Sequence, residues 1–248
     1  IAEAYEELIY SMVANAGQTG AHFTPKTLAS VILKVLSPTN FHRFYDPTLG
    51  TAGFLIEACK EFEQSEYYND LDHYPCFMGV EINPTAYLIG LLNVVLNGVY
   101  SFKLSFGNAL EKDLSNDVKY DLIMSNPPFG LADKKSIVFD ERKKPSQIEA
   151  LFLDHIMDKL EVGGRAAIIV PEHMLHNTNN LIVKLRRRLI EGFNLQHILC
   201  LPAGAMAPYS SVKLCVLFFE NTHPTEKYWV YNFNSNERFT KKNKLRRH

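Results

Sequence analysis

The sequence has few cysteines and no long hydrophobic run. Its 248 residues include four cysteines, and no two of them have the Cys-x-x-Cys spacing of many zinc and redox sites. This pattern favours reduced thiols in a cytoplasmic protein over a disulfide framework or a metal site. No apolar segment is long enough to span a membrane, and no signal peptide is visible. The sequence therefore argues against a membrane protein and against a disulfide-stapled secreted domain.

The net charge of the chain is small, and flexible linkers are absent from its sequence. The formal net charge is −1, so the chain as a whole does not attract nucleic acid electrostatically. No Gly-, Ser- or Pro-rich linker divides the chain, and residues 1–248 are therefore predicted to form one domain. Basic residues do gather in short clusters, each expected to be a solvated surface: Lys134-Lys135, Arg142-Lys143-Lys144, Arg186-Arg187-Arg188 and the tail from Lys241 to Arg247.

What the sequence does contain is a regular alternation of strand and helix patterns. Such alternation predicts an α/β fold with a doubly wound, mostly parallel sheet, and two consecutive late strands predict an antiparallel addition near the C-terminus. Strands are expected near 44–46, 77–81, 102–106, 120–125, 166–170, 197–201, 212–220 and 228–233. Residues 1–40 are expected to be a helical lead-in and residues 41–240 the α/β core. The start at Ile1 indicates a piece of a longer chain.

Several helix boundaries have recognisable end signals. Thr24 is predicted to cap a helix that has Pro25 at its first position, and Asn83 is predicted to cap one opened by Pro84. A further helix is expected to begin with a capping box formed by Ser146 and Glu149 and to end at Gly163-Gly164. These signals set the predicted helices between the strands.

The segment Asn126-Pro127-Pro128-Phe129 directly follows an apolar strand pattern. Two prolines cannot donate ladder hydrogen bonds, so they end the strand and form a stiff corner. That corner presents an amide side chain, bare carbonyls and an aromatic ring, which suits a flat substrate bearing an amino group. Taken alone, the tetrapeptide fits equally well a strand end with an incidental asparagine and a packed phenylalanine.

Polar side chains end four of the predicted strands: Asp46, Glu81, Asn108 and Asn126. Ligands of open α/β sheets bind beyond the carboxyl ends of the strands. The turn after Asp46 contains Gly50 and Gly53, which allow a ligand to approach the backbone, but it lacks the GxGxxG spacing of a dinucleotide fingerprint. An acid in the position of Glu81 suits ribose hydroxyls, and the combination predicts a nucleoside-binding cleft.

These segments resemble the motifs of N6-adenine DNA methyltransferases, and more closely the modification subunits of type I restriction–modification systems. The resemblance rests on GAHFTP (Gly20 to Pro25), DPTLGTAGFL (Asp46 to Leu55), Glu81, Gly107-Asn108 and NPPF (Asn126 to Phe129), in that order. It implies the S-adenosylmethionine-dependent methyltransferase fold. It also implies a cytoplasmic enzyme that methylates the N6 amino group of a flipped adenine in double-stranded DNA, with S-adenosylmethionine as the donor.

The resemblance assigns roles to individual residues. The catalytic residues are Asn126, Pro127, Pro128 and Phe129, and the substrate-binding residues are Phe129 and Tyr209. The cofactor-binding residues are Ala21, His22, Phe23, Thr24, Pro25, Lys26, Asp46, Thr48, Gly50, Thr51, Ala52, Gly53, Phe54, Glu81, Ile82, Asn108 and Ala109. No metal ligands are implied. Many relatives carry Asp where this chain has Asn108, which predicts a weaker hold on the cofactor adenine.

The resemblance also implies partners. The chain contains no evident target-recognition domain, so sequence specificity is expected to come from a separate subunit, with a nuclease subunit as a further partner. The segment Leu131 to Pro145 and the run Arg186 to Arg188 are candidates for contact with DNA phosphates. Two alternatives are kept: methylation of a protein glutamine amide by the same corner, and an inactive scaffold that binds cofactor or DNA. A nicotinamide-dependent oxidoreductase is disfavoured by the glycine spacing.

Overall fold

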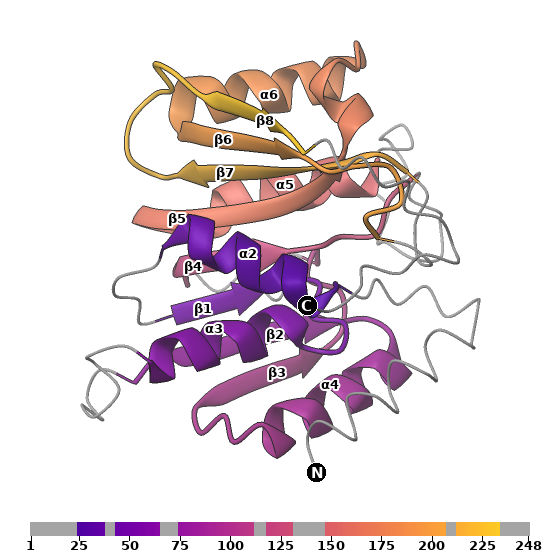
Figure 1. Ribbon diagram of the computed structural model, residues 1–248, viewed down its shortest axis with the longest axis vertical. Coiled ribbons are helices and arrows are strands. Elements are labelled where there is room, and N and C mark those ends of the chain that lie inside the picture. Colours follow the sequence, from indigo (N-terminus) through magenta and orange to yellow (C-terminus); the bar gives the residue numbers. More distant parts are fainter. Residues whose placement is uncertain are drawn as a thin grey trace. The chain divides into compact units, whose positions relative to one another are not determined.

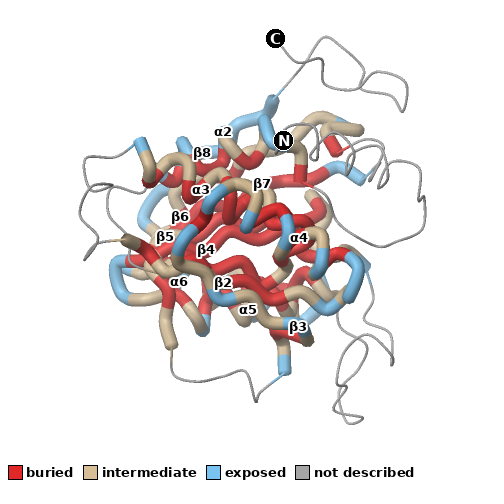
Figure 2. Tube along the Cα trace, turned by 90° about the horizontal axis from the view of Figure 1, so that it is seen from below, coloured by how far each residue is buried: buried red, intermediate tan, exposed pale blue. Residues whose placement is uncertain are grey.

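The computed structural model describes residues 24–37, 43–64, 74–111, 118–130, 147–206 and 212–233. The chain divides into two compact units, Ile1–Ser125 and Asn126–His248 (Figure 1). Buried residues are concentrated along the strands, whereas exposed residues follow the outer sides of the helices (Figure 2).

The first unit contains a parallel sheet in the order β3-β2-β1-β4. Its strands are β1 (Arg43–Asp46), β2 (Cys76–Glu81), β3 (Phe102–Phe106) and β4 (Tyr120–Ser125). β1 therefore pairs in parallel with β2 on one side and with β4 on the other. The direction of strand addition reverses between β1 and β4, which is where open α/β sheets place their ligands.

The helices of the first unit follow the predicted order. α2 (Lys26–Leu36) precedes β1, α3 (Gly53–Glu63) follows it, and α4 (Pro84–Leu96) follows β2. The predicted cap of α4 is confirmed, because the Asn83 side chain accepts hydrogen bonds from the backbone N–H groups of Thr85 and Ala86. The predicted Thr24 cap is wrong. Pro25 has extended backbone angles and occupies the N-cap position itself, so α2 begins one residue later without a side-chain cap.

Aromatic side chains fill much of the core of the first unit. Tyr45 stacks on Tyr120 with ring centroids 4.2 Å apart, and the Phe44 and Phe77 centroids lie 5.8 Å apart. These contacts join β1 to both of its neighbours and contribute to the core of the first unit.

The second unit contains a sheet in the order β5-β7-β6-β8. Its strands are β5 (Leu160–Pro171), β6 (Asn194–Cys200), β7 (Leu214–Glu220) and β8 (Trp229–Asn232). β7 runs antiparallel to both β5 and β6, which confirms the antiparallel addition. The last two strands do not pair with each other, however, because β8 pairs in parallel with β6.

The helices of the second unit are α5 (Ile148–Lys159), the short 3-10 helix η3 (Glu172–Leu175) and α6 (Asn180–Gly192). Two predicted boundaries of α5 are wrong. Gln147 is its N-cap without a side-chain capping bond, and the Glu149 side chain accepts a hydrogen bond from Gly130 instead of forming a capping box. The helix ends at Lys159, before the predicted Gly163-Gly164, because the backbone becomes extended at Leu160. The two glycines lie within β5, where their backbone exchanges hydrogen bonds with Asn221.

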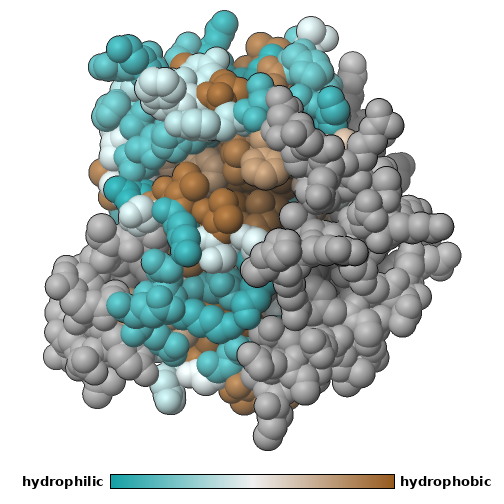
Figure 3. Space-filling view, in the orientation of Figure 1, coloured by the Kyte–Doolittle hydropathy of each residue, from teal (hydrophilic) through white to brown (hydrophobic). Residues whose placement is uncertain are grey.

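The described residues contain no helix long and apolar enough to cross a membrane. Within the same residues, no three His, Cys, Asp or Glu side chains are arranged to hold a metal ion. On the face shown in Figure 3, hydrophilic residues cover much of the described surface, with a hydrophobic patch among them.

Candidate functional site

The turn after β1 is tied to the end of β4. Asp46 is 1% exposed, and its Oδ1 accepts hydrogen bonds from the Thr48 backbone N–H at 2.9 Å and from the Thr48 hydroxyl at 3.3 Å. The same hydroxyl lies 2.9 Å from the hydroxyl of Ser125, the last residue of β4. These bonds hold the carboxyl ends of β1 and β4 together at the switch point of the sheet.

Glu81, at the end of β2, is held through both carboxylate oxygens. Oε2 accepts a hydrogen bond from the Gly50 backbone N–H and Oε1 accepts one from the Asn83 backbone N–H, each at 2.7 Å. A carboxylate has about four acceptor positions, so roughly two remain for a ligand. The side chain is thus oriented in advance while keeping acceptor capacity for a pair of hydroxyl groups.

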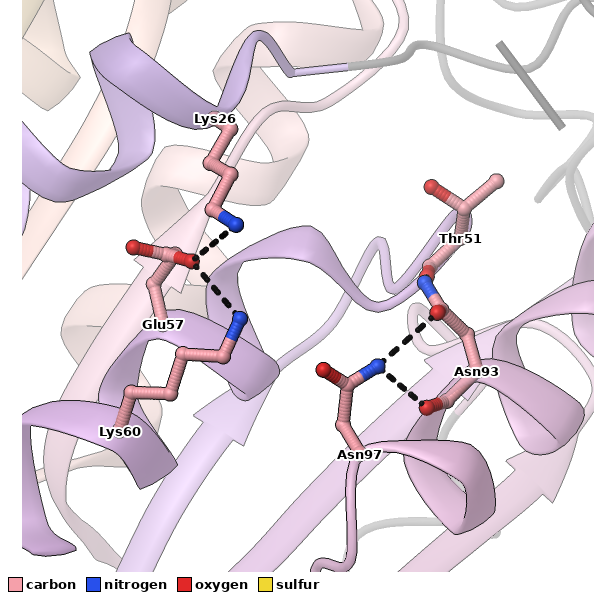
Figure 4. A network of polar contacts seen from close by, with 6 residues as sticks. All are labelled: Lys26, Thr51, Glu57, Lys60, Asn93 and Asn97. Atoms are coloured by element: carbon pink, nitrogen blue, oxygen red, sulfur yellow. Dashed lines mark hydrogen bonds and ion pairs between the residues drawn. The ribbon is translucent and has the colours of Figure 1, made fainter. Parts of the chain in front are cut away.

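The same turn is enclosed by β2 and α4. The Leu49 backbone N–H donates to the Val80 carbonyl at 2.9 Å, and the Asn93 side-chain amide donates to the Thr51 carbonyl at 2.9 Å. Asn97 in turn donates to Asn93, as Figure 4 shows. Asn93 was not predicted as a site residue, and its side chain reaches the turn from 42 residues away.

Two glycines outside the turn make room for it. A Cβ atom on Gly90, in the middle of α4, would lie 2.8 Å from the Gly50 carbonyl oxygen. A Cβ atom on Gly79, in β2, would lie 2.6 Å from the Leu49 side chain. Both positions were also missed. A glycine inside a helix is a detectable signal, because glycine costs about 1 kcal/mol there relative to alanine and tends to have a packing reason.

We expect Gly90→Ala to weaken cofactor binding about 10- to 100-fold, equivalent to roughly 1.4–2.8 kcal/mol. The new methyl group would meet a backbone carbonyl, which cannot rotate away as a side chain can, so the turn must shift. Isothermal titration calorimetry with S-adenosylmethionine measures the change. Gly192→Ala is the matched control, because its Cβ atom would meet nothing within 4 Å. Equal affinities for the two variants would contradict the predicted role of the glycine turn in cofactor binding.

The two glycines of the turn differ in their backbone conformations. Gly50 lies in the left-handed region of backbone conformation, with a φ of 55°. Ala52, two residues later, also lies there, with a φ of 67°. Gly53 starts α3, and a Cβ atom there would make only an ordinary contact of 3.8 Å with the Thr24 carbonyl oxygen. The conformation of the turn therefore favours glycine at position 50, whereas position 53 could accept alanine in the absence of a ligand.

The end of the GAHFTP segment lies against the start of α3. The Thr24 carbonyl approaches Gly53, and the Lys26 ammonium lies 4.0 Å from the Glu57 carboxylate, which Lys60 also approaches at 3.5 Å (Figure 4). Thr24 and Pro25 are thus brought close to the glycine turn. The predicted cofactor residues Ala21, His22 and Phe23 lie outside the described residues, and so does Tyr209.

Asn108 follows β3 at the same edge of the sheet. The preceding Gly107 donates its backbone N–H to the Glu81 carbonyl at 2.9 Å, which places Asn108 beside the end of β2. The Asn108 Oδ1 already accepts a hydrogen bond from the Leu110 backbone N–H at 3.0 Å. Ala109 is buried.

Two other predicted cofactor residues differ in exposure. Ile82 is 51% exposed, whereas the Phe54 side chain is buried in the core. A ligand contact by Phe54 would therefore involve its backbone.

The NPPF segment opens the second unit. Asn126 is 2% exposed and its Oδ1 is buried; Pro127 is buried, whereas Pro128 and Phe129 are half-buried. One peptide bond joins Asn126 to Ser125, the residue bonded to the glycine turn. The tetrapeptide therefore continues directly from a strand end whose position the turn fixes.

The profile of the N-6 DNA Methylase family matches residues 1–248. The chain belongs to this family. It is 30% identical over 239 residues to the EcoEI methylase subunit of Escherichia coli, a match that covers 92% of this chain and 48% of that protein. It is 32% identical over 260 residues to the EcoKI methylase subunit of E. coli K12, covering 94% of this chain and 48% of that protein. Both relatives are type I restriction enzyme subunits.

Solved structures confirm the fold class predicted from the sequence. A chain from a type I R-M system matches this chain with a TM-score of 0.86 and 31% identity, covering 99% of this chain and 52% of that one. The EcoKI M protein matches with a TM-score of 0.73 and 30% identity, covering 94% and 54%. This chain thus spans about half the length of the relatives it matches.

The basic run Arg186 to Arg188 on α6 is largely engaged in contacts within the protein. Arg186 donates to the Met174 carbonyl at 2.8 Å, and Arg188 pairs with Asp154 and Asp158 on α5. Arg187 is the most exposed of the three, with 72% of its side chain exposed. These contacts support the structural interpretation of the run over the phosphate-binding one.

Burial changes the acid–base behaviour of Asp46 at the end of β1. The pKa of the Asp46 carboxyl is raised from 3.8 to about 7, chiefly by burial. The hydrogen bonds from Thr48 oppose this rise, and the nearby Glu81 charge adds to it. A buried carboxyl group with a pKa near neutrality is ready to ionise when a cation binds beside it.

Proposed function

We propose that this chain is the catalytic part of an S-adenosylmethionine-dependent methyltransferase that acts on the N6 amino group of adenine in DNA. The observation that carries the proposal is the hydrogen bond between Thr48 and Ser125. Through it, the NPPF corner begins one residue after a group fixed to the glycine turn. Membership of the N-6 DNA Methylase family supports the same activity.

The residues around the turn fit the chemistry of S-adenosylmethionine. Glu81 keeps acceptor positions for the two ribose hydroxyls, and Asp46 can ionise beside a positively charged ligand. Gly50 has no side chain, so a ligand can approach its backbone closely, and glycine adopts the left-handed conformation of this position without strain. When bound, S-adenosylmethionine supplies an electrophilic methyl group. The Asn108 Oδ1 accepts one hydrogen bond from Leu110 and has a second lone pair, which would accept a hydrogen bond from the adenine amino group of the cofactor.

The NPPF corner suits an amine that is a poor nucleophile. The lone pair of the adenine amino nitrogen is delocalised into the ring, so catalysis must favour a more pyramidal nitrogen. The Asn126 Oδ1 and the Pro127 carbonyl would accept its two hydrogens and so promote that geometry. The stiffness of two consecutive prolines holds these acceptors in place. Catalysis would then rest on orientation and electrostatics, without a covalent enzyme intermediate.

Phe129 would stack on the target adenine. A base must leave the duplex to reach such a corner, which costs a few kcal/mol. Stacking on an aromatic side chain returns about 1–3 kcal/mol per base. The free energy gained by stacking is therefore close to the free energy that extrusion costs. Contacts to DNA phosphates or to a partner subunit would supply the remaining free energy. Tyr209 is proposed as a second stacking residue.

A separate subunit is proposed to select the target sequence. The curated relatives include methylase subunits of type I restriction enzymes, and this chain spans about half of their length. Arg186 and Arg188 are bonded within the protein, so the basic run Arg186 to Arg188 has few guanidinium groups available to bind DNA phosphates. A specificity subunit, and with it a nuclease subunit, are thus the proposed partners in a cytoplasmic assembly.

The test is to identify the methyl acceptor. The full-length protein, purified with a co-encoded specificity subunit, is incubated with radioactively labelled S-adenosylmethionine, DNA and a mixture of bacterial proteins. We expect label in N6-methyladenine after enzymatic digestion of the DNA and chromatography of its nucleosides. Label in glutamine side-chain amides of protein would overturn the proposal in favour of a protein methyltransferase. Cofactor binding without any transfer would instead identify a scaffold.

A further inference from the structure

A carboxyl side chain with no exposed surface lies at the start of α5. Glu149 is 0% exposed, although carboxyl groups are rarely buried without a specific partner. Its Oε2 accepts a hydrogen bond from the Gly130 backbone N–H at 3.0 Å. Its Oε1 accepts no hydrogen bond from the described residues and lies 3.9 Å from Nε2 of His173. The main polar contact of this side chain is thus Gly130, the residue that follows Phe129.

Gly130 is held through both of its backbone polar groups. Besides the bond to Glu149, its carbonyl accepts a hydrogen bond from the Ile148 backbone N–H at 2.9 Å. Gly130 has a φ of 114°, a conformation that residues with a side chain rarely adopt. The first residues of α5 therefore fix an unusual backbone conformation immediately after the NPPF segment.

α5 is a firm support for this contact. Phe152, Leu153 and Ile156 are buried along it. On its other side, Asp154 and Asp158 pair with the guanidinium of Arg188 on α6. Because α5 is held on both sides, a side chain in its first turn has a fixed position and can restrain the loop residue to which it is hydrogen-bonded.

We propose that Glu149 is a positioning residue that holds the NPPF corner in its productive shape through Gly130. The inference rests on the proposed function and adds a residue to it. The two prolines stiffen the start of the corner, whereas Phe129 and Gly130 have no such restriction. The Glu149 bond supplies the missing restraint at the far end, so that the Phe129 ring keeps the orientation on which the extruded base stacks.

The experiment compares Glu149→Ala with Glu149→Gln in the full-length protein and its specificity subunit. Alanine removes the acceptor, whereas the glutamine amide oxygen can still accept from Gly130 in nearly the same shape. We expect Glu149→Ala to lower kcat for adenine methylation about tenfold, since misplacing a reacting group by about 1 Å costs up to about 100-fold. Glutamine is expected to restore kcat. Glu172→Ala, which removes a partly exposed acid of the same unit, is the control.

Two further readouts separate positioning from general destabilisation. Hydrogen exchange of the Gly130 amide should be faster in the alanine variant than in wild type and glutamine variant. The dissociation constant for S-adenosylmethionine should stay within about twofold, because the cofactor turn belongs to the first unit.

The outcomes distinguish this inference from the proposed function. Unchanged Gly130 exchange in Glu149→Ala overturns the positioning role, whether or not the enzyme is active. Full kcat in the alanine variant, or an equal loss in the glutamine variant, overturns it too. A wild-type protein that makes no N6-methyladenine refutes the proposed function instead, and the exchange measurement still decides the role of Glu149.

Discussion

Asn126→Ala should lower kcat for adenine methylation about 100- to 1,000-fold, the loss typical when one preorganised polar group is removed from a transition state. The substitution removes the proposed acceptor for an amino hydrogen and leaves the Pro127 carbonyl as the other proposed acceptor. Cofactor affinity should be nearly unchanged, because the turn and Glu81 are untouched. Single-turnover methylation assays with saturating cofactor and DNA measure the loss in the chemical step directly.

Two other variants define what this result means. Asn126→Asp keeps an acceptor oxygen, so it should retain more activity than the alanine variant. Asn179→Ala removes the side chain that caps α6, which is expected to cost about 1 kcal/mol of stability without changing kcat. Wild-type kcat in Asn126→Ala would show that the corner is a strand end and not the catalytic centre.

Asp46→Asn should stabilise the cofactor-free protein at pH 8 by roughly 4 kcal/mol and leave its stability unchanged well below the unfolded pKa of 3.8. The pKa of Asp46 is about 7 when folded and 3.8 when unfolded, so the folded chain binds the proton more tightly. The Asp46 contribution to wild-type stability therefore falls as pH rises from 3.8 to about 7, and its full cost is present above that range. Asparagine avoids the cost while its oxygen still accepts from Thr48.

Urea unfolding at several pH values measures this effect. Asp158→Asn is the matched control, since that side chain is 62% exposed and its charge is solvated, so no comparable gain is expected. The same Asp46→Asn variant should bind S-adenosylmethionine more weakly at pH 8, because it cannot supply a negative charge. Parallel stability curves for wild type and Asp46→Asn across the pH range would contradict the assignment.

The strands and their polar ends were predictable from local patterns. The apolar segments before Asp46, Glu81 and Asn126 form the strands β1, β2 and β4, and the first two acids meet at the glycine turn. This success has a simple cause. Parallel strands bring their carboxyl ends to one edge, so a residue's place in its own strand decides where it lies in the sheet.

The supports of the turn were not predictable in the same way. Gly90 and Asn93 act through contacts with residues about 40 positions earlier, and the local sequence of α4 specifies a helix without revealing what touches it. Glu149 shows the converse error. Its spacing from Ser146 predicts a capping box, but the N-cap is Gln147 and the Glu149 side chain accepts a hydrogen bond from Gly130, a tertiary partner 19 residues earlier.

The position of β1 between β2 and β4 also affects how the chain is made. Phe44 pairs with Leu122, so this contact spans 78 residues, and the bond between Thr48 and Ser125 spans 77. Contacts so distant in sequence form slowly, because a long loop must close first. During synthesis, β1 can pair with β2 well before β4 leaves the ribosome. The nascent chain is therefore expected to pass through a stage in which the glycine turn can already contact β2 but still lacks its bond to Ser125 at the end of β4.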